Sequence, residues 1–322
     1  MTFPRRAAIA GAGALFLPST TRAQAWPARP LRLVIPFPPG GAQDNLGRLV
    51  ASKLSETLGQ QVVPDNRPGA SGILAAEIVA RAPADGYTVL LGNIASHTIN
   101  PHVQKIPYDP FADFVPAAMV AATPNLLCAS PSFPHDTVAK LVAAAKAAPG
   151  KLNYGSSGAS TSPSLSMELF KLRAGIDIQL AAYKGAAPAA TDAMAGHIPL
   201  VISNLDSLRA LAQTGKLKAI AVTGPQRSPT MPDTPTFAES GYPDVVLTSW
   251  SMLMLPAGTS PAIAQRLHAG MSTMNTDAEV RGRLAQMGFD PVTLPLDQLA
   301  PYIRAEHTRW GEVIRAASIK ME

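Results

Sequence analysis

The chain has almost no cysteine and few charged side chains. Cys128 is the only cysteine among 322 residues, so no disulfide can form within the chain. Charged residues make up 15% of the sequence, and Lys and Arg form no cluster, so the basic footprint of a nucleic-acid-binding protein is missing. After residue 25, no apolar run approaches the roughly 20 residues that a membrane-spanning helix needs. Nucleic-acid binding, a disulfide scaffold and a spanning helix are therefore not expected.

The first 25 residues have the features of a secretory signal peptide. Arg5 and Arg6 precede an apolar run from Ala7 to Leu17, and the motif Ala23-Gln24-Ala25 follows. A charged start, about ten apolar residues and an A-x-A ending are typical of export, and the run is too short to cross a bilayer. We expect cleavage after Ala25 and a periplasmic product, with the ordinary and twin-arginine export routes both open.

The remaining chain is large enough for two lobes. Removal of the signal peptide leaves 297 of the 322 residues, which is at the upper limit for one hydrophobic core. Short β-rich runs alternate with helical patterns, which is typical of parallel sheets flanked by helices. We predict an α/β protein in which two long extended segments, 115–130 and 245–255, cross between lobes. Two helices, 263–275 and 299–316, are predicted to close the chain.

The same alternation predicts the other elements. Strands are expected at 31–36, 61–64, 87–91, 152–155, 178–183, 198–202 and 217–223. Helices are expected at 46–58, 73–81, 137–148, 165–172, 189–195 and 205–213. Because the carboxyl ends of parallel strands meet at one edge of a sheet, a ligand is expected where these strands lead into helices.

The turn after the first strand is the most informative loop. It reads Pro36-Phe37-Pro38-Pro39-Gly40-Gly41-Ala42-Gln43-Asp44. Glycines ahead of a helix expose backbone N–H groups, and the start of a helix carries partial positive charge, so an anion can bind there. Asp44 has two interpretations: it caps the helix, or it meets an amine of a ligand.

Two further turns rich in Gly and Ser precede helices. Residues 66–72 lack the Gly-Lys-Ser/Thr of a nucleotide loop and are interpreted as the start of a helix. Residues 155–163 end in Ser162, a predicted N-cap, and Pro163, a predicted first helical residue, and their hydroxyls and amides can hold a carboxylate. The strand ends Tyr183-Lys184-Gly185 and Ser203-Asn204 lie in equivalent positions.

No catalytic or metal-binding motif is evident. The serine-rich turn has Ala159 where a Gly-x-Ser-x-Gly motif needs its second glycine, and the six histidines lack triad or metal-ligand spacing. We therefore predict no catalytic residue, no metal and no cofactor. Two alternatives stay open: an exported hydrolase that uses Ser156 or Ser157, and an adaptor whose main partner is another protein.

Taken in order, these motifs resemble those of the tripartite tricarboxylate transporter receptors, the Bug family. The most specific resemblance lies in residues 29–44. Weaker matches cover nearly the whole mature chain, at residues 66–72, 85–87, 99–101, 107–110, 151–158, 183–185, 195–196, 215–217 and 256–259. The resemblance implies a type II periplasmic binding protein fold, in which two doubly wound lobes are joined by two crossing segments.

The resemblance also suggests an organisation and a role. Lobe I would comprise residues 26–124 and 246–322, and lobe II residues 125–245. The lobes would close on a small organic carboxylate and deliver it to a membrane permease or a sensor. We expect the protein to act as a monomer.

Carried over to this sequence, the resemblance places the ligand at the turns described above. The lobe I side of the cleft would be formed by Phe37, Pro38, Gly40, Gly41 and Asp44. The other candidates around the cleft are Ser96, Ser157, Gly158, Ser160, Thr161, Tyr183, Gly185, Ser203 and Asn204. All of them would act in binding, through amides, hydroxyls and one carboxylate.

Two positions depart from the pattern of many family members. Ser164 stands where many members have a His, and Ser203 stands where many have an Asp ahead of the Asn that corresponds to Asn204. The ammonium group of an amino acid needs an acidic partner, and position 203 does not supply one. We therefore expect a plain dicarboxylate or an aromatic carboxylate as the solute.

Overall fold

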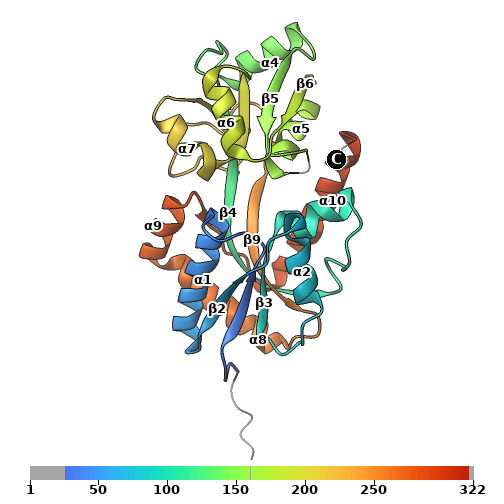
Figure 1. The fold of residues 1–322 in the computed structure, drawn as a ribbon, viewed down its shortest axis with the longest axis vertical. Helices are drawn as coiled ribbons and strands as arrows, with labels where there is room; N and C mark the ends of the chain where they lie inside the picture. The colour runs from blue at the N-terminus through green and yellow to red at the C-terminus, as the bar shows by residue number, and fades with distance from the viewer. Residues whose placement is uncertain (1–25, 160, 319–322) are drawn as a thin grey trace, which may run out of the picture.

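The computed structural model describes residues 26–159 and 161–318 and has two lobes (Figure 1). The strands are β1 (Leu31–Ile35), β2 (Val62–Asn66), β3 (Thr88–Asn93), β4 (Phe114–Ala129), β5 (Leu152–Ser156), β6 (Ile178–Ala182), β7 (Leu200–Asn204), β8 (Lys218–Val222), β9 (Thr248–Pro256) and β10 (Asp290–Pro291). The α-helices are α1 (Ala42–Leu58), α2 (Ile73–Ala80), α3 (Asn100–Val103), α4 (Val138–Ala147), α5 (Ser162–Ala174), α6 (Ala186–Ala195), α7 (Leu205–Gln213), α8 (Pro261–Thr276), α9 (Ala278–Gln286) and α10 (Leu296–Ala316). The predicted signal peptide lies outside the described residues. No helix within them is both long and apolar enough to span a bilayer.

The strands of both lobes are linked through β4. In lobe I, β1 lies between β2 and β3 in parallel, and β9 and β4 continue this sheet antiparallel. In lobe II, β5 lies between β6 and β7 in parallel. β4 pairs with β9 up to Pro124 and with β7 from Asn125 onward. Figure 1 shows β4 and β9 running side by side between the lobes.

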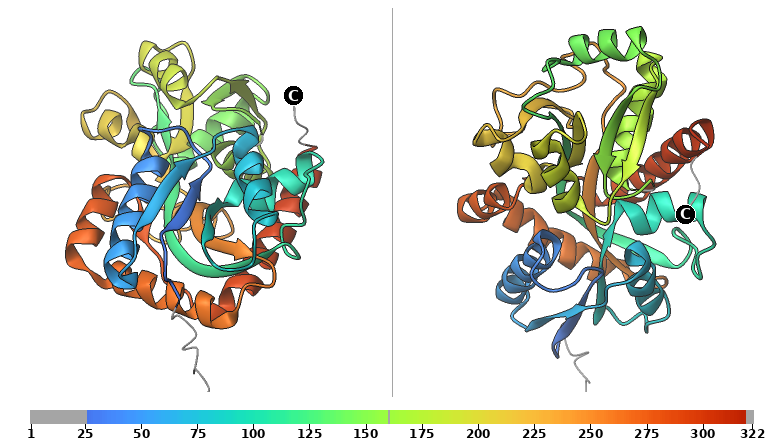
Figure 2. Two further views of the ribbon diagram at one scale, coloured as in Figure 1. Left: turned by 60° about the horizontal axis from the view of Figure 1, so that its bottom comes forward. Right: turned by 45° about the horizontal axis from the view of Figure 1, so that its top comes forward.

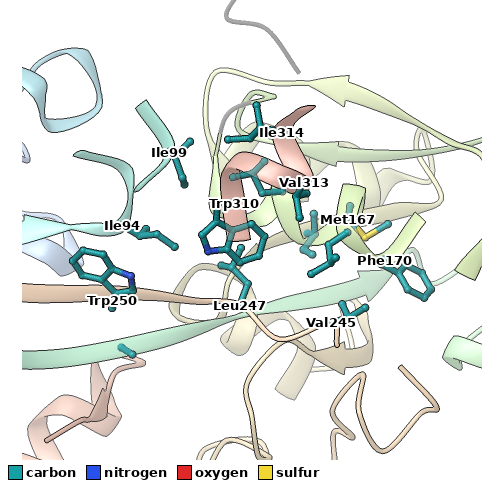
Figure 3. Close-up of a cluster of buried hydrophobic side chains, with 14 of the residues drawn as sticks. Ile94, Ile99, Met167, Phe170, Val245, Leu247, Trp250, Trp310, Val313 and Ile314 are labelled. Carbon is teal, nitrogen blue, oxygen red and sulfur yellow. The ribbon is translucent and has the colours of Figure 1, made fainter. Parts of the chain in front are cut away.

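The helices cover the sheets according to their apolar faces. In lobe I, α1 and α8 bury one cluster of side chains against one face of the sheet, including Leu46, Leu54 and Leu267. On the other face, a cluster continues from lobe I into lobe II without a break. Figure 3 shows its middle, where Trp310 of α10 lies between Trp250 of β9 on one side and Met167 and Phe170 of α5 on the other. Apolar packing therefore joins the lobes on the α10 side.

The C-terminal helix ties the lobes together on that side. Figure 2 shows α10 reaching from lobe I along lobe II. Arg309 on α10 donates through Nη2 to the backbone oxygens of Asp244, at 2.9 Å, and Val246, at 2.6 Å, just ahead of β9. On the other side, Arg209 of α7 donates to the backbone oxygens of Ala285 and Gln286 at the end of α9, both at 2.6 Å.

The structure corrects several predicted elements. Both predicted closing helices are present, but a third helix, α9, lies between them and was missed; its N-cap is Asp277, whose side chain accepts from Glu279 N at 2.8 Å. The predicted strand at 245–255 begins only at Thr248, and the strand at 198–202 begins at Leu200. Ser162 is the first residue of α5 and not its N-cap, which is Thr161. A π-helical turn, η2 (Ala95–Ile99), was not predicted.

Candidate functional site

A cavity of about 250 Å³ lies between the lobes, and both lobes contribute to its wall. Lobe I supplies residues from the ends of β1, β3 and β9, and lobe II supplies residues from the ends of β5 and β7. The lining residues are Phe37, Gln43, Ser71, Asn93, Ile94, Ala95, Ile99, Ser157, Thr161, Ser162, Pro163, Ser203, Asn204, Ser249 and Trp250. None of these described residues has a charged side chain.

Several helix starts converge on this cavity. Gln43 is the second residue of α1, Ser162 is the first residue of α5, and Asn204 precedes the first residue of α7. The first backbone N–H groups of a helix have no partner within the helix, and the peptide dipoles place partial positive charge there. The cavity is therefore electrostatically suited to an anion although no cationic side chain lines it.

Three side-chain amides line the cavity, and the oxygen of each already accepts a hydrogen bond. The Oδ1 of Asn93 accepts from Ser96 N at 2.9 Å, the Oε1 of Gln43 from Ser251 Oγ at 3.1 Å, and the Oδ1 of Asn204 from Ser249 Oγ at 3.3 Å. Within the described part of the chain, the Nδ2 of Asn93 is buried without a hydrogen-bond partner. Three amide NH₂ groups are thus oriented as donors by the bonds that hold their oxygens.

The Ser249 hydroxyl connects the two lobes at the site. It lies within hydrogen-bonding distance of Ser162 Oγ at the start of α5 and donates to Asn204 Oδ1 at the start of α7. Ser249 belongs to β9, so a strand of lobe I holds two polar residues of lobe II in register. A buried polar network of this kind fixes the direction of its members.

The backbone ahead of α2 is strained where it reaches the cavity. Ala70 has a φ of 45° and Ser71 a φ of 53°, in the left-handed region that side chains other than glycine rarely adopt. Ser71 lines the cavity, and its carbonyl oxygen accepts from Asn100 Nδ2 at 3.2 Å. Residues 66–72 were interpreted only as the start of a helix. They also form part of the cavity wall.

Asp44 stabilises the first turn through hydrogen bonds and is not among the residues that line the cavity. Its Oδ2 accepts from Gly40 N and from Arg48 Nε, each at 2.9 Å, and its Oδ1 accepts from Asn66 Nδ2 at 2.8 Å. Burial acts to raise the pKa of Asp44, but the bonds from Arg48, Gly40 and Asn66 outweigh it and hold the pKa below its usual value. The predicted capping role of Asp44 was wrong, because the N-cap of α1 is Gly41; Asp44 is the third residue of the helix and accepts hydrogen bonds from Gly40, Arg48 and Asn66 instead.

The predicted site residues divide into two groups. Those that line the cavity are Phe37, Ser157, Thr161, Ser203 and Asn204. Those that the structure places outside its wall are Pro38, Gly40, Gly41, Asp44, Ser96, Gly158, Tyr183 and Gly185. Ser160 lies outside the described residues.

Two residues of the second group have partners elsewhere. The Tyr183 hydroxyl donates to Asp192 Oδ2 at 2.7 Å, and the carbonyl oxygen of Gly158 accepts from Thr161 Oγ1 at 2.9 Å.

Among the lining residues, sequence reasoning missed Gln43, Ser71, Asn93, Ser249 and Trp250, and it included Ser162 only as part of a turn whose hydroxyls and amides can hold a carboxylate. A usable signal exists for Asn93, which ends β3 just as Asn204 ends β7. No local signal marks Ser249 or Trp250, because they belong to a strand that returns from lobe II and reaches the site only through its pairing with β4.

The hydrolase alternative requires a base, typically a histidine, next to Ser156 or Ser157. Ser157 lines the cavity, but within the described residues neither it nor Ser156 is hydrogen-bonded to a His. His97 is fully buried, its Nδ1 lies 2.8 Å from Ser96 Oγ, and burial lowers its pKa to about 4. Across the described ranges, no group of three or more His, Cys, Asp or Glu side chains is placed to hold a metal ion.

Comparisons with known proteins point to one family. The sequence profile described as tripartite tricarboxylate transporter family receptor matches residues 46–319. The chain is 35% identical to Protein BugT of Bordetella pertussis (strain Tohama I) over 305 residues, which cover 93% of each chain.

Two similar solved structures hold carboxylates. R. palustris Rpa4515 with adipate is 37% identical, with a TM-score of 0.79, and the match covers 92% of this chain and all of that one. MatC (Rpa3494) from Rhodopseudomonas palustris with bound malate is 29% identical, with a TM-score of 0.74, and the match covers 90% of this chain and all of that one. These likenesses confirm the fold that the sequence predicts.

Proposed function

We propose that this chain, which belongs to the tripartite tricarboxylate transporter receptor family, captures a small organic carboxylate in the periplasm by closing its two lobes. One observation carries the proposal: amide and hydroxyl donors from both lobes line a single cavity that contains no charged side chain. The relatives with adipate and malate make dicarboxylates the first candidates. Phe37, Ser157, Thr161, Ser203 and Asn204 are proposed ligand contacts, together with Gln43, Asn93 and Ser162.

Uncharged donors are sufficient for useful affinity. A hydrogen bond to a charged group contributes roughly 1.5–3 kcal/mol, and a helix start adds about 0.3–1 kcal/mol. Four such bonds contribute roughly 6–12 kcal/mol before ordering costs, and micromolar binding corresponds to about 8 kcal/mol. A cavity without Arg or Lys can therefore hold a carboxylate and still release it.

Closure follows from the division of donors between lobes. Asn93 and Gln43 belong to lobe I, whereas Ser162 and Asn204 belong to lobe II, so a ligand makes all its contacts only when the lobes are close. Binding then shifts the population toward the closed form. Small-angle scattering should show a smaller radius of gyration with saturating ligand. An unchanged radius would contradict closure.

The binding proposal is tested with matched pairs of compounds. Thermal-shift and calorimetric titrations should show that adipate, malate or another dicarboxylate stabilises the protein, while the corresponding diamide does not. A ligand at 100 times its dissociation constant stabilises by about 2.7 kcal/mol. Stabilisation by the diamide alone, or by no small molecule, would contradict the proposal and favour the adaptor.

The hydrolase alternative is tested in the same samples. Mass spectrometry of a bound ester or amide after prolonged incubation should show the compound unchanged. The ester or amide should also remain unchanged after incubation with the Ser157→Ala variant. Turnover that depends on Ser156 or Ser157 would replace the binding proposal with the enzyme.

We further propose that residues 1–25 direct export and that the mature monomer delivers its solute to a membrane permease or a sensor. Osmotic-shock fractionation should place the protein in the periplasm, with Trp26 as the first residue. A full-length protein retained in the cytoplasm would contradict the export proposal. Light scattering should give the mass of one chain.

A further inference from the structure

A second cavity of about 240 Å³ lies behind the crossing strands, on the face of the β4–β9 pair that α10 covers. Met119 and Ala122 of β4, β10 and Tyr302 of α10 contribute walls from lobe I. The turn Gly224–Gln226, which follows β8, contributes a wall from lobe II. Trp250 lines this cavity as well as the first one.

The polar groups of this cavity differ from those of the first. Asp290 lines it, and within the described residues its carboxylate forms no ion pair or side-chain hydrogen bond. Burial alone raises the pKa of Asp290, with no cation acting against it. The partly buried carboxylate of Glu306 is by contrast partnered, because it accepts from Trp310 Nε1 at 2.9 Å and lies 3.6 Å from Arg309.

Two aromatic residues line the same cavity as this carboxylate. The rings of Trp250 and Tyr302 both line the cavity, with centroids 6.2 Å apart and planes at 69°. Most of the remaining wall is apolar, and no Lys or Arg is among the described lining residues. An aromatic surface attracts a cation through the negative face of its ring, and a carboxylate adds charge complementarity.

We propose that this second cavity binds a small alkylammonium ion, with Asp290 as its counter-ion and Trp250 and Tyr302 as its aromatic wall. The ammonium charge pairs with the Asp290 carboxylate, and its alkyl groups contact the two aromatic side chains. An anion of the kind proposed for the first cavity is disfavoured here, because its charge would face Asp290 at close range. The proposal does not depend on the function proposed for the first cavity.

Calorimetric titration with choline and with n-butylammonium tests the proposal on the mature protein, at pH 7.5 and at matched ionic strength in sodium chloride. At least one of the two should bind saturably. The neutral carbon isostere of choline, 3,3-dimethyl-1-butanol, should bind at least 10-fold more weakly. No binding of either cation, or equal binding of the isostere, would overturn the proposal.

Variants locate the site. Asp290→Asn should weaken cation binding at least 10-fold, while Asp297→Asn, which removes the same charge from an exposed position outside the cavity, should leave it unchanged. If Asp290→Asn does not fold, Val292→Phe, which fills the cavity from its wall, should abolish binding instead. Cation binding that survives in the folded variant would place the cation elsewhere and overturn the assignment.

Discussion

Two cavities of nearly equal volume share Trp250 as a wall, and their polar groups are of opposite kinds. The first, at about 250 Å³, contains amide and hydroxyl donors and no charge, whereas the second, at about 240 Å³, contains a carboxylate without a cation. Cavity volume therefore does not determine which proposed ligand each cavity prefers. Their polar groups do, because buried donors require an acceptor, whereas a partly buried carboxylate without a cation in the same wall favours a positively charged ligand.

The largest effect is expected from truncating the residue that both cavities share as a wall. Trp250 is 1% exposed, and truncation of a buried aromatic residue to Ala typically costs about 3–5 kcal/mol. Trp250→Ala should lower the free energy of unfolding by that amount in urea titrations, and Trp250→Phe by clearly less. A loss of unfolding free energy below about 1 kcal/mol for the Ala variant would contradict the interpretation of Trp250 as a tightly packed wall between the two cavities.

A charge placed in the first cavity should abolish its preference for anions. Asn93→Asp keeps the shape of the side chain and the acceptor for Ser96 N but replaces a free donor with a negative oxygen. Carboxylate affinity at pH 8 should fall at least about 100-fold, because like charges at close range cost several kcal/mol.

Asn93→Ala separates the donor from the charge. It removes only one hydrogen bond to a charged group and should weaken binding by about 10-fold. Equal losses in the two variants would contradict the electrostatic interpretation of the cavity.

The stabilisation that Asp44 contributes at the first turn is expected to depend on pH. Asp44→Asn should lower the free energy of unfolding by about 1–2 kcal/mol at pH 7, because the carboxylate accepts bonds from Arg48, Gly40 and Asn66. The folded pKa of Asp44 is depressed, so this stabilisation is present above the unfolded pKa of about 4 and is lost as the pH falls through the folded pKa.

Urea titrations of the wild type and the variant at pH 7 and pH 3 measure this effect. The difference between them should shrink at the lower pH. Asp297→Asn, at an exposed position, serves as the control and should show little difference at either pH. A difference for Asp44→Asn that grows on acidification would contradict the depressed pKa.

The two cavities also differ in backbone strain, which lies at the wall of the first cavity and not of the second. The expected effect on stability is smaller. Among the described residues, the non-glycine residues with positive φ are Ala70, Ser71 and Ser318, and of these Ser71 lines the first cavity. Ala70 is exposed, so Ala70→Gly should relieve strain and raise the free energy of unfolding by up to about 1 kcal/mol. Ala143→Gly, an exposed position inside α4, should lower it by about 1 kcal/mol. The same sign in both variants would contradict the strain.

The sequence predicts the fold more completely than the site. Alternating patterns place β1, α1, β5 and α7 within a few residues, since local periodicity and Gly or Pro signals set their limits. The short polar helix α9 escaped prediction because its capping by Asp277 lies in a region with little apolar periodicity. Phe37 and Asn204 are predictable because they follow strands that the pattern reveals.

The remaining site residues depend on contacts between distant segments. Ser249 and Trp250 reach the cavity only because β9 returns from lobe II and pairs with β4. The donor role of Gln43 depends on Ser251, 208 residues further along the chain. The second cavity is equally hidden, because it joins β4, the turn after β8, β10 and α10. Single-sequence patterns do not carry this information.

The most direct test is a co-crystal structure of the mature protein with the dicarboxylate that stabilises it most. The account predicts one ligand carboxylate within hydrogen-bonding distance of Asn93 in lobe I and of Ser162 or Asn204 in lobe II. A ligand held by one lobe alone, or seated beside Asp290 in the second cavity, would contradict it.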